Sequence, residues 1–268
     1  MKKMLVTLAL LSMVTVVQGQ DFAKKRLENS PRHHDWVQIK VGNRTVHAFV
    51  AIPEKKEKAT GVIVIHENKG LTEWACGVAD QLAEQGYVAI APDLLSGMGP
   101  GGGNTKDFKS TNDATMAIGQ LSMKPEQVTA DLNAVADFLV KHPACNGKIT
   151  VSGFCWGGGQ SFRFATDRKD LKAAFVFYGQ FAQTKENLAK VPCPVYGFYA
   201  ENDAGINGTI PTSQKLMKEL NKTYEAVTYP GAGHGFMRAG EDPAAKGTAN
   251  AKGRDAAWER WKAILKKI

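Results

Sequence analysis

The segment around Cys155 constrains the fold of this chain more than any other. Residues 148–151 have the pattern of a short strand, and residues 160–165 have that of the first turns of a helix. Between them, Gly153-Phe154-Cys155-Trp156-Gly157-Gly158 supplies the small residues that a sharp strand-to-helix turn needs. The arrangement predicts a nucleophile elbow, in which the side chain of Cys155 is held at the apex of the turn.

Cys155 at this apex would have the surroundings of a nucleophile. The helix that follows would present backbone N–H groups and the positive end of its dipole to the turn. Both stabilise a thiolate and an oxyanion, so the position suits a reactive thiol. The alternative is a glycine-rich turn around a buried structural cysteine. Residues elsewhere in the chain must decide between the two.

The segments on both sides of this turn alternate between strand and helix patterns. Short continuous apolar runs are typical of strands that are buried on both faces of a sheet. Such runs occupy residues 61–65, 87–91, 173–178, 195–199 and 225–229. Helical spacing of apolar residues occurs at residues 71–85, 126–141, 212–221 and 251–268. We therefore predict an α/β fold: one doubly wound, mostly parallel sheet with helices on both faces.

The segment before these elements has a different pattern. Residues 35–41 and 44–52 alternate polar and apolar side chains around the turn Gly42-Asn43, which predicts an antiparallel hairpin. Residues 20–34 are polar, and we expect an extended arm there. His33-His34 suggests a metal site, but two adjacent histidines without a third ligand are more often surface residues.

The first residues of the chain have the pattern of a secretory signal peptide. Lys2 and Lys3 form a basic start, residues 5–17 are apolar, and Val17-Gln18-Gly19 resembles a cleavage site. The apolar run is short for a membrane span, which disfavours the alternative of an uncleaved anchor. We expect residues 1–19 to be removed and residues 20–268 to form a single domain. The mature protein would be exported, to the periplasm or outside the cell, and would have no membrane attachment.

The basic charge of the chain is more typical of a solvated surface than of a nucleic-acid-binding one. The formal charge of +8 falls to +6 without Lys2 and Lys3, and the excess is spread along the chain. Basic runs with interleaved aromatic residues, which nucleic-acid binding uses, are absent, so we predict no nucleic-acid partner. We also expect a monomer.

The four cysteines do not form a C-x-x-C pair, so zinc or thioredoxin chemistry has little support. We predict no metal and no organic cofactor. Cys145 and Cys193 both precede predicted strands and are the only plausible disulfide partners in an exported protein. Those strands should flank a third one, which separates them by about 9–10 Å, whereas a disulfide needs Cα atoms within about 7 Å. The bridge is therefore the less favoured alternative.

One segment departs from the alternation of strands and helices. Residues 96–124 contain six glycine or proline residues near their start, and they follow the carboxyl end of a strand. Ligands bind at that edge of open α/β sheets, and long glycine-rich loops in compact domains are often functional. We interpret the segment as a mobile lid, with an ordinary surface insertion as the alternative.

Polar residues follow three of the predicted strands, where ligand-binding loops lie. They are the sequences His66-Glu67-Asn68, Glu201-Asn202-Asp203 and Gly233-His234-Gly235. With the predicted elbow, the chain order becomes Cys155, Asp203, His234, which is the nucleophile–acid–histidine order of α/β-hydrolases. His234 would exchange a proton with the nucleophile, and Asp203 would fix its tautomer and stabilise the imidazolium.

These motifs resemble those of the dienelactone hydrolase family, including its exported members. The resemblance extends from about residue 31 to the last helix. Its specific motifs are Glu67 after a buried strand, Ala91-Pro92-Asp93-Leu94, the Cys155 elbow, Glu201-Asn202-Asp203 and Gly233-His234-Gly235-Phe236. It implies an α/β-hydrolase fold and a Cys–His–Asp triad that opens a small ester or lactone through an acyl-enzyme.

The resemblance also implies roles for further residues. Glu67 would sit beside the thiol and help control its ionisation, and the backbone N–H groups of Trp156 and Asn68 would form the oxyanion hole. Arg238 matches an arginine that pairs with Glu67 or with a substrate carboxylate, and Tyr178 matches a tyrosine of the pocket.

One position departs from the family pattern. The family's type member has a second carboxylate-binding arginine shortly after Pro-Asp-Leu, where this chain has Leu95-Ser96. This puts a dienelactone substrate in doubt, although the hydrolase chemistry stands. The alternatives are a broad carboxylesterase, a thioesterase, or a catalytically silent binding protein with the same fold.

Overall fold

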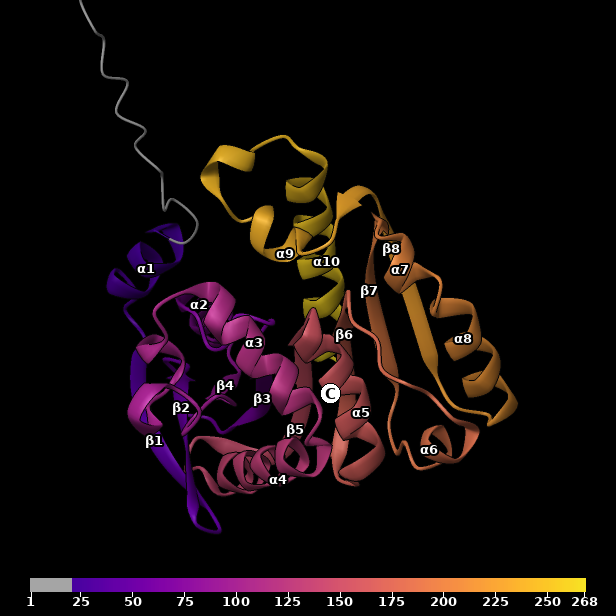
Figure 1. Cartoon of the computed structure of the whole chain (residues 1–268). Coiled ribbons are helices and arrows are strands. Elements are labelled where there is room, and N and C mark those ends of the chain that lie inside the picture. Colours follow the sequence, from indigo (N-terminus) through magenta and orange to yellow (C-terminus); the bar gives the residue numbers. More distant parts are fainter. Residues whose placement is uncertain (1–20) are drawn as a thin grey trace, which may run out of the picture.

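A computed structural model describes residues 21–268, and the predicted signal peptide at residues 1–19 lies outside them. The chain folds around an eight-stranded sheet with the order β1-β2-β4-β3-β5-β6-β7-β8 (Figure 1). The strands are β1 (His33–Val41), β2 (Arg44–Ile52), β3 (Ala59–Ile65), β4 (Val88–Asp93), β5 (Cys145–Phe154), β6 (Leu171–Phe177), β7 (Val195–Asn202) and β8 (Tyr224–Gly233). Only β1–β2 and β2–β4 pair antiparallel, so the mostly parallel sheet and the N-terminal hairpin were both predicted correctly.

Helices cover both faces of the sheet. The longer ones are α1 (Asp21–Glu28), α2 (Glu73–Glu84), α3 (Thr111–Ser122), α4 (Pro125–Lys141), α5 (Trp156–Asp167), α8 (Ile210–Glu219) and α10 (Ala249–Leu265). The shorter ones are α6 (Lys185–Ala189), α7 (Ala204–Asn207) and α9 (Phe236–Ala239). Buried residues of α1, α2, α9 and α10 pack in one core cluster, and those of α3, α4, α5, α6 and α8 pack in the other. The prediction of helices on both faces is therefore confirmed.

Strand β3 shows why the apolar runs predict central strands. All seven of its residues are buried. Val62 and Val64 belong to the core cluster beside α2, whereas Ile63 and Ile65 belong to the one beside α4. Because successive side chains of a strand point to opposite faces, a strand covered on both faces needs apolar residues at every position.

The expectation of an extended arm at residues 20–34 was wrong for its first part. Residues 21–28 form helix α1, which packs on α2. Ala23 is fully buried in the same core cluster as α2, and Phe22 and Leu27 pack against that cluster. The three apolar residues lie toward α2, while Lys24, Lys25 and Glu28 are exposed. A single short apolar face in a polar segment was too weak a signal in the sequence.

The interpretation of residues 96–124 as one long loop was also incomplete. Its second half is helix α3, which buries Ala114, Ala117, Ile118 and Leu121. The glycine-rich half contains two short 3₁₀ helices, η1 (Pro100–Gly102) and η2 (Thr105–Asp107). Movement of this segment remains a prediction.

The cysteines are free in the structure. Cys145 begins β5 and Cys193 precedes β7, and these strands flank β6 as expected. All four thiols are unpaired, so the less favoured disulfide is not formed.

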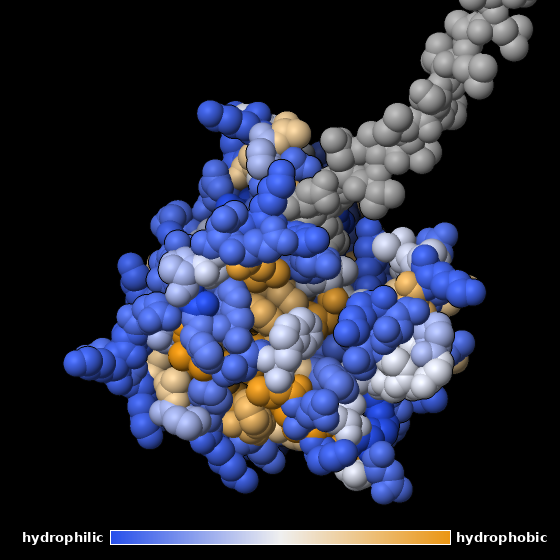
Figure 2. All heavy atoms as spheres, turned by 90° about the vertical axis from the view of Figure 1, so that its left-hand side faces the viewer, coloured by the Kyte–Doolittle hydropathy of each residue, from blue (hydrophilic) through white to orange (hydrophobic). Residues whose placement is uncertain are grey.

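The outer edge of the sheet is formed by β1 and carries one unusual side chain. Trp36 is 65% exposed and packs edge-on against Phe49, with ring centroids 5.6 Å apart. Figure 2 shows this side of the molecule, where a small apolar area is ringed by hydrophilic side chains. The expectation of a monomer stays a prediction. The exposed Trp36 on this edge strand is a reason to measure the oligomeric state.

Candidate active site

Cys155 lies at the junction of β5 and α5, in the conformation of a nucleophile elbow. Its φ of 56° and ψ of −118° lie in a region that residues with a side chain rarely adopt. The surroundings hold it there, because the Cys155 N–H donates to the carbonyl of Phe177 at 3.0 Å and its carbonyl accepts from Gly158 N–H at 2.9 Å. Strain of this kind is found where a side chain must be presented in one direction.

The glycines of the motif are required by close backbone contacts around this turn. A Cβ atom on Gly153 would lie 1.9 Å from the Gly157 carbonyl oxygen, and one on Gly157 would lie 2.4 Å from that of His66. A Cβ on Gly158 would meet the Phe177 oxygen at 2.5 Å. Any larger residue would therefore force the backbone of β3, β5 or β6 to move.

His234 and Asp203 meet in front of this elbow. Asp203 follows β7, His234 follows β8, and these strands are neighbours, so the two loops lie together. His234 Nδ1 is 2.6 Å from Asp203 Oδ2. A hydrogen bond with the side chain of Cys155, followed by that with Asp203, raises the pKa of His234 to about 9 against the opposing effect of burial. The predicted order of three residues along the chain is therefore also a contiguous set in space.

Glu67 forms a second carboxylate–cation pair beside the first. Its carboxylate, 9% exposed, accepts from Arg238 Nε at 2.7 Å and from the Tyr178 hydroxyl at 3.4 Å. Burial, and next the charge of Glu67, raise the pKa of Tyr178 well above its usual 10, so the phenol remains a donor. The hydrogen bonds of Glu67 thus go to Arg238 and Tyr178, although Cys155 is near enough for its charge to act on both.

Tyr178 links the two pairs. Its ring lies fully buried, edge-on to the imidazole of His234 with centroids 5.2 Å apart. Its φ of 39° is again unusual for a residue with a side chain, and its N–H donates to the Phe198 carbonyl at 2.8 Å. The strained backbone turns the phenol toward Glu67 at the carboxyl end of β6.

The oxyanion role expected of Trp156 and Asn68 stays a prediction. Trp156 is the first residue of α5, and Asn68 lies in the turn after β3. Within residues 21–268, neither backbone N–H donates to another backbone group. The indole of Trp156 stacks on His66 and donates to the Ser122 hydroxyl at 2.8 Å, which ties the last residue of α3 to the elbow.

Several supporting residues were not predicted from the sequence. Asp93, at the end of β4, accepts from the N–H and hydroxyl of Thr105 at 2.8 and 2.6 Å, which anchors the glycine-rich segment to the sheet. Ser96 is fully buried; its hydroxyl donates to the Asp93 carbonyl and accepts from His47 N–H. Asp93 and Ser96 had signals in the sequence, through the Ala-Pro-Asp-Leu motif and the missing arginine, but neither signal indicated these hydrogen bonds.

The structure gives no support to a metal or a membrane span in residues 21–268. No cluster of three or more histidine, cysteine, aspartate or glutamate residues is arranged for metal binding in this part of the chain. His33 and His34 instead lie on β1, beside Asp35 and Asp80 respectively. Within the same residues, no helix is both long and apolar enough to cross a bilayer.

The open, mostly parallel sheet and its strained strand-to-helix cysteine place the protein in the α/β-hydrolase class. Within that class the chain belongs to the dienelactone hydrolase family, whose family model matches residues 46–268. It is therefore a hydrolase.

Individual relatives agree with this membership. A Yersinia pestis protein provisionally named carboxymethylenebutenolidase is 32% identical over 203 residues, 70% of this chain and 73% of that protein. A Saccharolobus solfataricus protein with the same provisional name is 30% identical over 257 residues and covers 83% and 94% of the two chains. A Klebsiella pneumoniae structure provisionally described as a dienelactone hydrolase superimposes with a TM-score of 0.76 at 25% identity, over 88% of this chain and 99% of that one.

Proposed function

We propose that this protein opens a small ester or lactone by transferring the acyl group to Cys155. The observation that carries the proposal is the contiguous set of Cys155, His234 and Asp203, with the thiol presented on a strained elbow at the start of a helix. A reactive thiol paired with a histidine that a carboxylate orients is the arrangement that nucleophilic acyl transfer requires.

In the first half of the reaction, the Cys155 sulfur attacks the substrate carbonyl carbon. The carbonyl oxygen becomes an oxyanion, which the backbone N–H groups of Trp156 and Asn68 would stabilise. The carbon–oxygen bond then breaks, and the leaving alkoxide takes the proton of the His234 imidazolium. For a lactone this alkoxide stays attached to the acyl group, and for an ester it departs as an alcohol.

In the second half, water hydrolyses the thioester on Cys155. His234 is now neutral and accepts a proton from water as the water attacks the acyl carbon. The carbon–sulfur bond breaks, the thiolate returns to its pairing with the imidazolium, and the carboxylic acid product leaves. Asp203 holds Nδ1 throughout, so that Nε2 serves the reacting atoms.

Arg238 is the proposed contact for a substrate carboxylate. It uses Nε to bind Glu67, and within residues 21–268 its two terminal nitrogens make no hydrogen bond. A guanidinium presents donors in a planar fork that matches a carboxylate. The remaining edge of the fork is therefore available for a charged group of the substrate.

Ser96 favours a broader substrate range than that of a dienelactone-specific enzyme. Its hydroxyl is buried and engaged with Asp93 and His47, so this position contributes no charged contact to a substrate. With Arg238 as the arginine proposed to contact the substrate, esters that carry one carboxylate or none would be accepted. This observation favours a carboxylesterase as the second candidate.

The test is a hydrolysis screen with the variants Cys155→Ala and Cys155→Ser. We expect Cys155→Ala to stay folded and to lose several orders of magnitude of kcat, because a covalent nucleophile is removed. Mass spectrometry of the native enzyme quenched during turnover should show an acyl adduct on the peptide that contains Cys155. Retention of more than about a tenth of kcat in Cys155→Ala would exclude the mechanism. Absence of hydrolysis of every lactone, ester and thioester tried would favour a binding protein.

We also propose that the protein is exported, because residues 1–19 have the pattern of a signal peptide. Expression of the full chain in a bacterium, followed by cell fractionation and N-terminal sequencing, tests this. A mature protein that begins at Gln20 outside the cytoplasm is the expected result, and an uncleaved cytoplasmic protein would contradict it.

A further inference from the structure

We propose that Glu241 is a positioning residue for this site, an inference that rests on the function proposed above. Glu241 lies two residues after α9. This helix carries Arg238 and begins two residues after His234. Its carboxylate is 3% exposed and connects α9 to three other helices. The geometry points to Glu241 as the group that keeps Arg238 against Glu67.

Two of the contacts of Glu241 come from α2. The indole Nε1 of Trp74 donates to Oε2 at 2.8 Å, and the amide of Gln81 donates to Oε1 at 3.0 Å. Both donors are buried side chains of a helix that packs firmly in the core. These bonds therefore fix the carboxylate with respect to the sheet.

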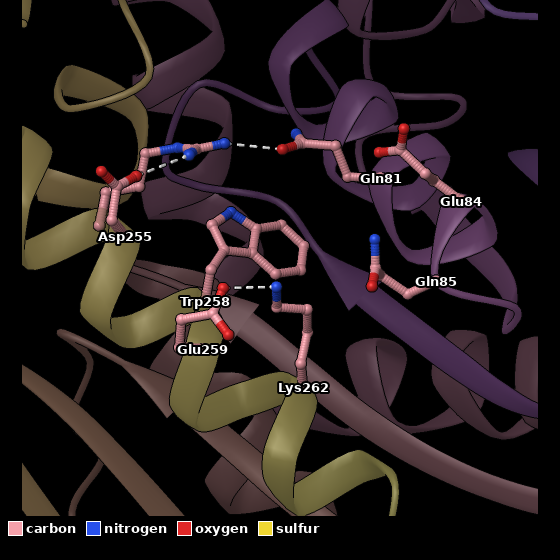
Figure 3. Close-up of a pocket in the computed structure, with 8 residues that line it drawn as sticks. Gln81, Glu84, Gln85, Asp255, Trp258, Glu259 and Lys262 are labelled. Carbon is pink, nitrogen blue, oxygen red and sulfur yellow. Dashed lines mark hydrogen bonds and ion pairs between the residues drawn. The ribbon is translucent and has the colours of Figure 1, made fainter.

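Two further contacts are cations from opposite ends of the chain. Arg26 Nε on α1 lies 3.1 Å from Oε1, and Arg254 Nη2 on α10 lies 3.6 Å from Oε2. Arg254 also donates to Gln81 at 2.7 Å, across the top of a surface pocket of about 220 Å³ between α2 and α10 (Figure 3). A buried carboxylate held by two cations and two neutral donors has one stable position.

Helix α9 needs such an anchor because it cannot hold itself in place. It has four residues, and helices this short are unstable on their own. Glu241 is tied to this helix, because its N–H donates to the Arg238 carbonyl at 3.2 Å. The position of the Arg238 guanidinium is therefore set by what fixes Glu241 on one side and Phe236, fully buried, on the other.

This arrangement gives α1 a part in the site. Arg26 lies before residue 46, where the match to the family model begins. The N-terminal helix thus supports Arg238 from outside the matched region.

The experiment measures discrimination, defined as the ratio of kcat/KM for an ester with a carboxylate to that for a neutral ester of the same size. Glu241→Gln keeps the volume of the side chain but removes the charge that holds Arg26 and Arg254. We expect it to lower the discrimination about tenfold while kcat for the neutral ester changes less than about threefold. In an Arg238→Ala background, Glu241→Gln should have no further effect on the ratio, because coupled residues are not additive.

Asp80→Asn is the matched control. Asp80 is fully buried on α2 and binds Arg32, His34 and Ser30; among residues 21–268, none of its hydrogen bonds or ion pairs goes to α9. It should lower the melting temperature and leave the discrimination unchanged. Arg26→Gln removes a single contact of Glu241 and should give a smaller change in the same direction as Glu241→Gln, even if the latter folds poorly.

A second measurement is independent of the substrate. The Arg238 Nε–H resonance in a ¹⁵N NMR spectrum, assigned with Arg238→Lys, reports its bond to Glu67 and should shift in Glu241→Gln. If Arg238→Ala leaves the discrimination unchanged, the carboxylate-binding role of Arg238 fails, and this resonance alone decides the role of Glu241. An unshifted resonance, or equal loss of discrimination in Asp80→Asn, would overturn the inference.

Discussion

Two carboxylate–base pairs stand side by side at the carboxyl edge of the sheet, and they differ in what the base can do. Asp203 binds His234 at 2.6 Å, and Glu67 binds Arg238 at 2.7 Å. Both bases come from the chain just after β8. The imidazolium of His234, with a pKa of about 9, can pass its proton to a leaving group, whereas the guanidinium of Arg238 stays charged.

Their exposure follows the same division. The His234 side chain is 42% exposed, so the proton it carries can reach substrate and water. The Arg238 side chain is less exposed, at 28%, and its partner Glu67 is 9% exposed against 13% for Asp203. The comparison indicates that one pair moves a proton during the reaction and that the other provides a fixed field and a binding group.

Removal of His234, the residue that transfers the proton, should have the largest effect. We expect His234→Ala to lower kcat for an alkyl ester by on the order of 10⁴-fold or more, as for a nucleophile that loses its base. Circular dichroism should show an unchanged fold, and the double variant with Cys155→Ala should be no slower than either single variant. An activity within a factor of ten of the native enzyme would end the assignment of His234 as acid and base.

Asp203→Asn should have the next largest effect. The amide keeps the shape but presents a donor or a neutral acceptor to Nδ1, which removes the preference for the productive tautomer. We expect kcat to fall about 10³- to 10⁴-fold. Glu67→Gln, the equivalent change in the fixed pair, should lower kcat much less and change its pH profile. Equal losses in the two variants would contradict the division of roles.

Arg238→Ala should act on substrate choice. A charge-assisted hydrogen bond contributes roughly 1.5–3 kcal/mol, so its loss should lower kcat/KM about ten- to a hundredfold for esters that carry a carboxylate. Neutral esters of the same size should be affected far less. Should both substrate sets fall together, Arg238 acts only through Glu67, and the preference for acidic substrates must be abandoned.

The smallest expected effect is a pH dependence of proton donation. Hydrogen bonding to Cys155 and to Asp203 raises the pKa of His234 to about 9, so the imidazolium is present below that pH and is lost above it. The kcat for alkyl esters, whose leaving alkoxide needs a proton, should decline above about pH 9. A p-nitrophenyl ester, which needs no such proton, should keep its rate there. NMR titration of His234 checks the value directly, and in Cys155→Ala its pKa should be lower, because the main cause of the rise is gone.

The sequence was most informative where a local pattern determines the structure. The apolar runs at residues 61–65 and 87–91 correspond to β3 and β4, because a strand covered on both faces must be apolar throughout. Cys155 was identified by the glycines around it, since the turn is made by neighbouring residues. His234 and Asp203 were placed by chain order and by the rule that parallel strands end at one edge.

The sequence was least informative where a residue depends on distant partners. Glu241 is one glutamate in a polar turn, and its four partners lie on three helices that no local pattern connects to it. Helix α1 was missed for the same reason, because its short apolar face has meaning only once α2 is in place. The absence of an arginine at Ser96 was noticed, but the buried hydrogen bonds that occupy this position came only from the structure.

The close contacts around the elbow also determine how the enzyme could change over evolutionary time. At Cys155 itself, exchange of sulfur for oxygen alters one atom at the end of a side chain and leaves the backbone untouched. At Gly153, Gly157 and Gly158 the smallest possible side chain already falls on a backbone atom. Mutation of the codon for Cys155 can therefore change the reactive atom, whereas the glycines of the loop that presents it tolerate almost no substitution. The reactive atom of this turn can therefore change in evolution more readily than its backbone conformation.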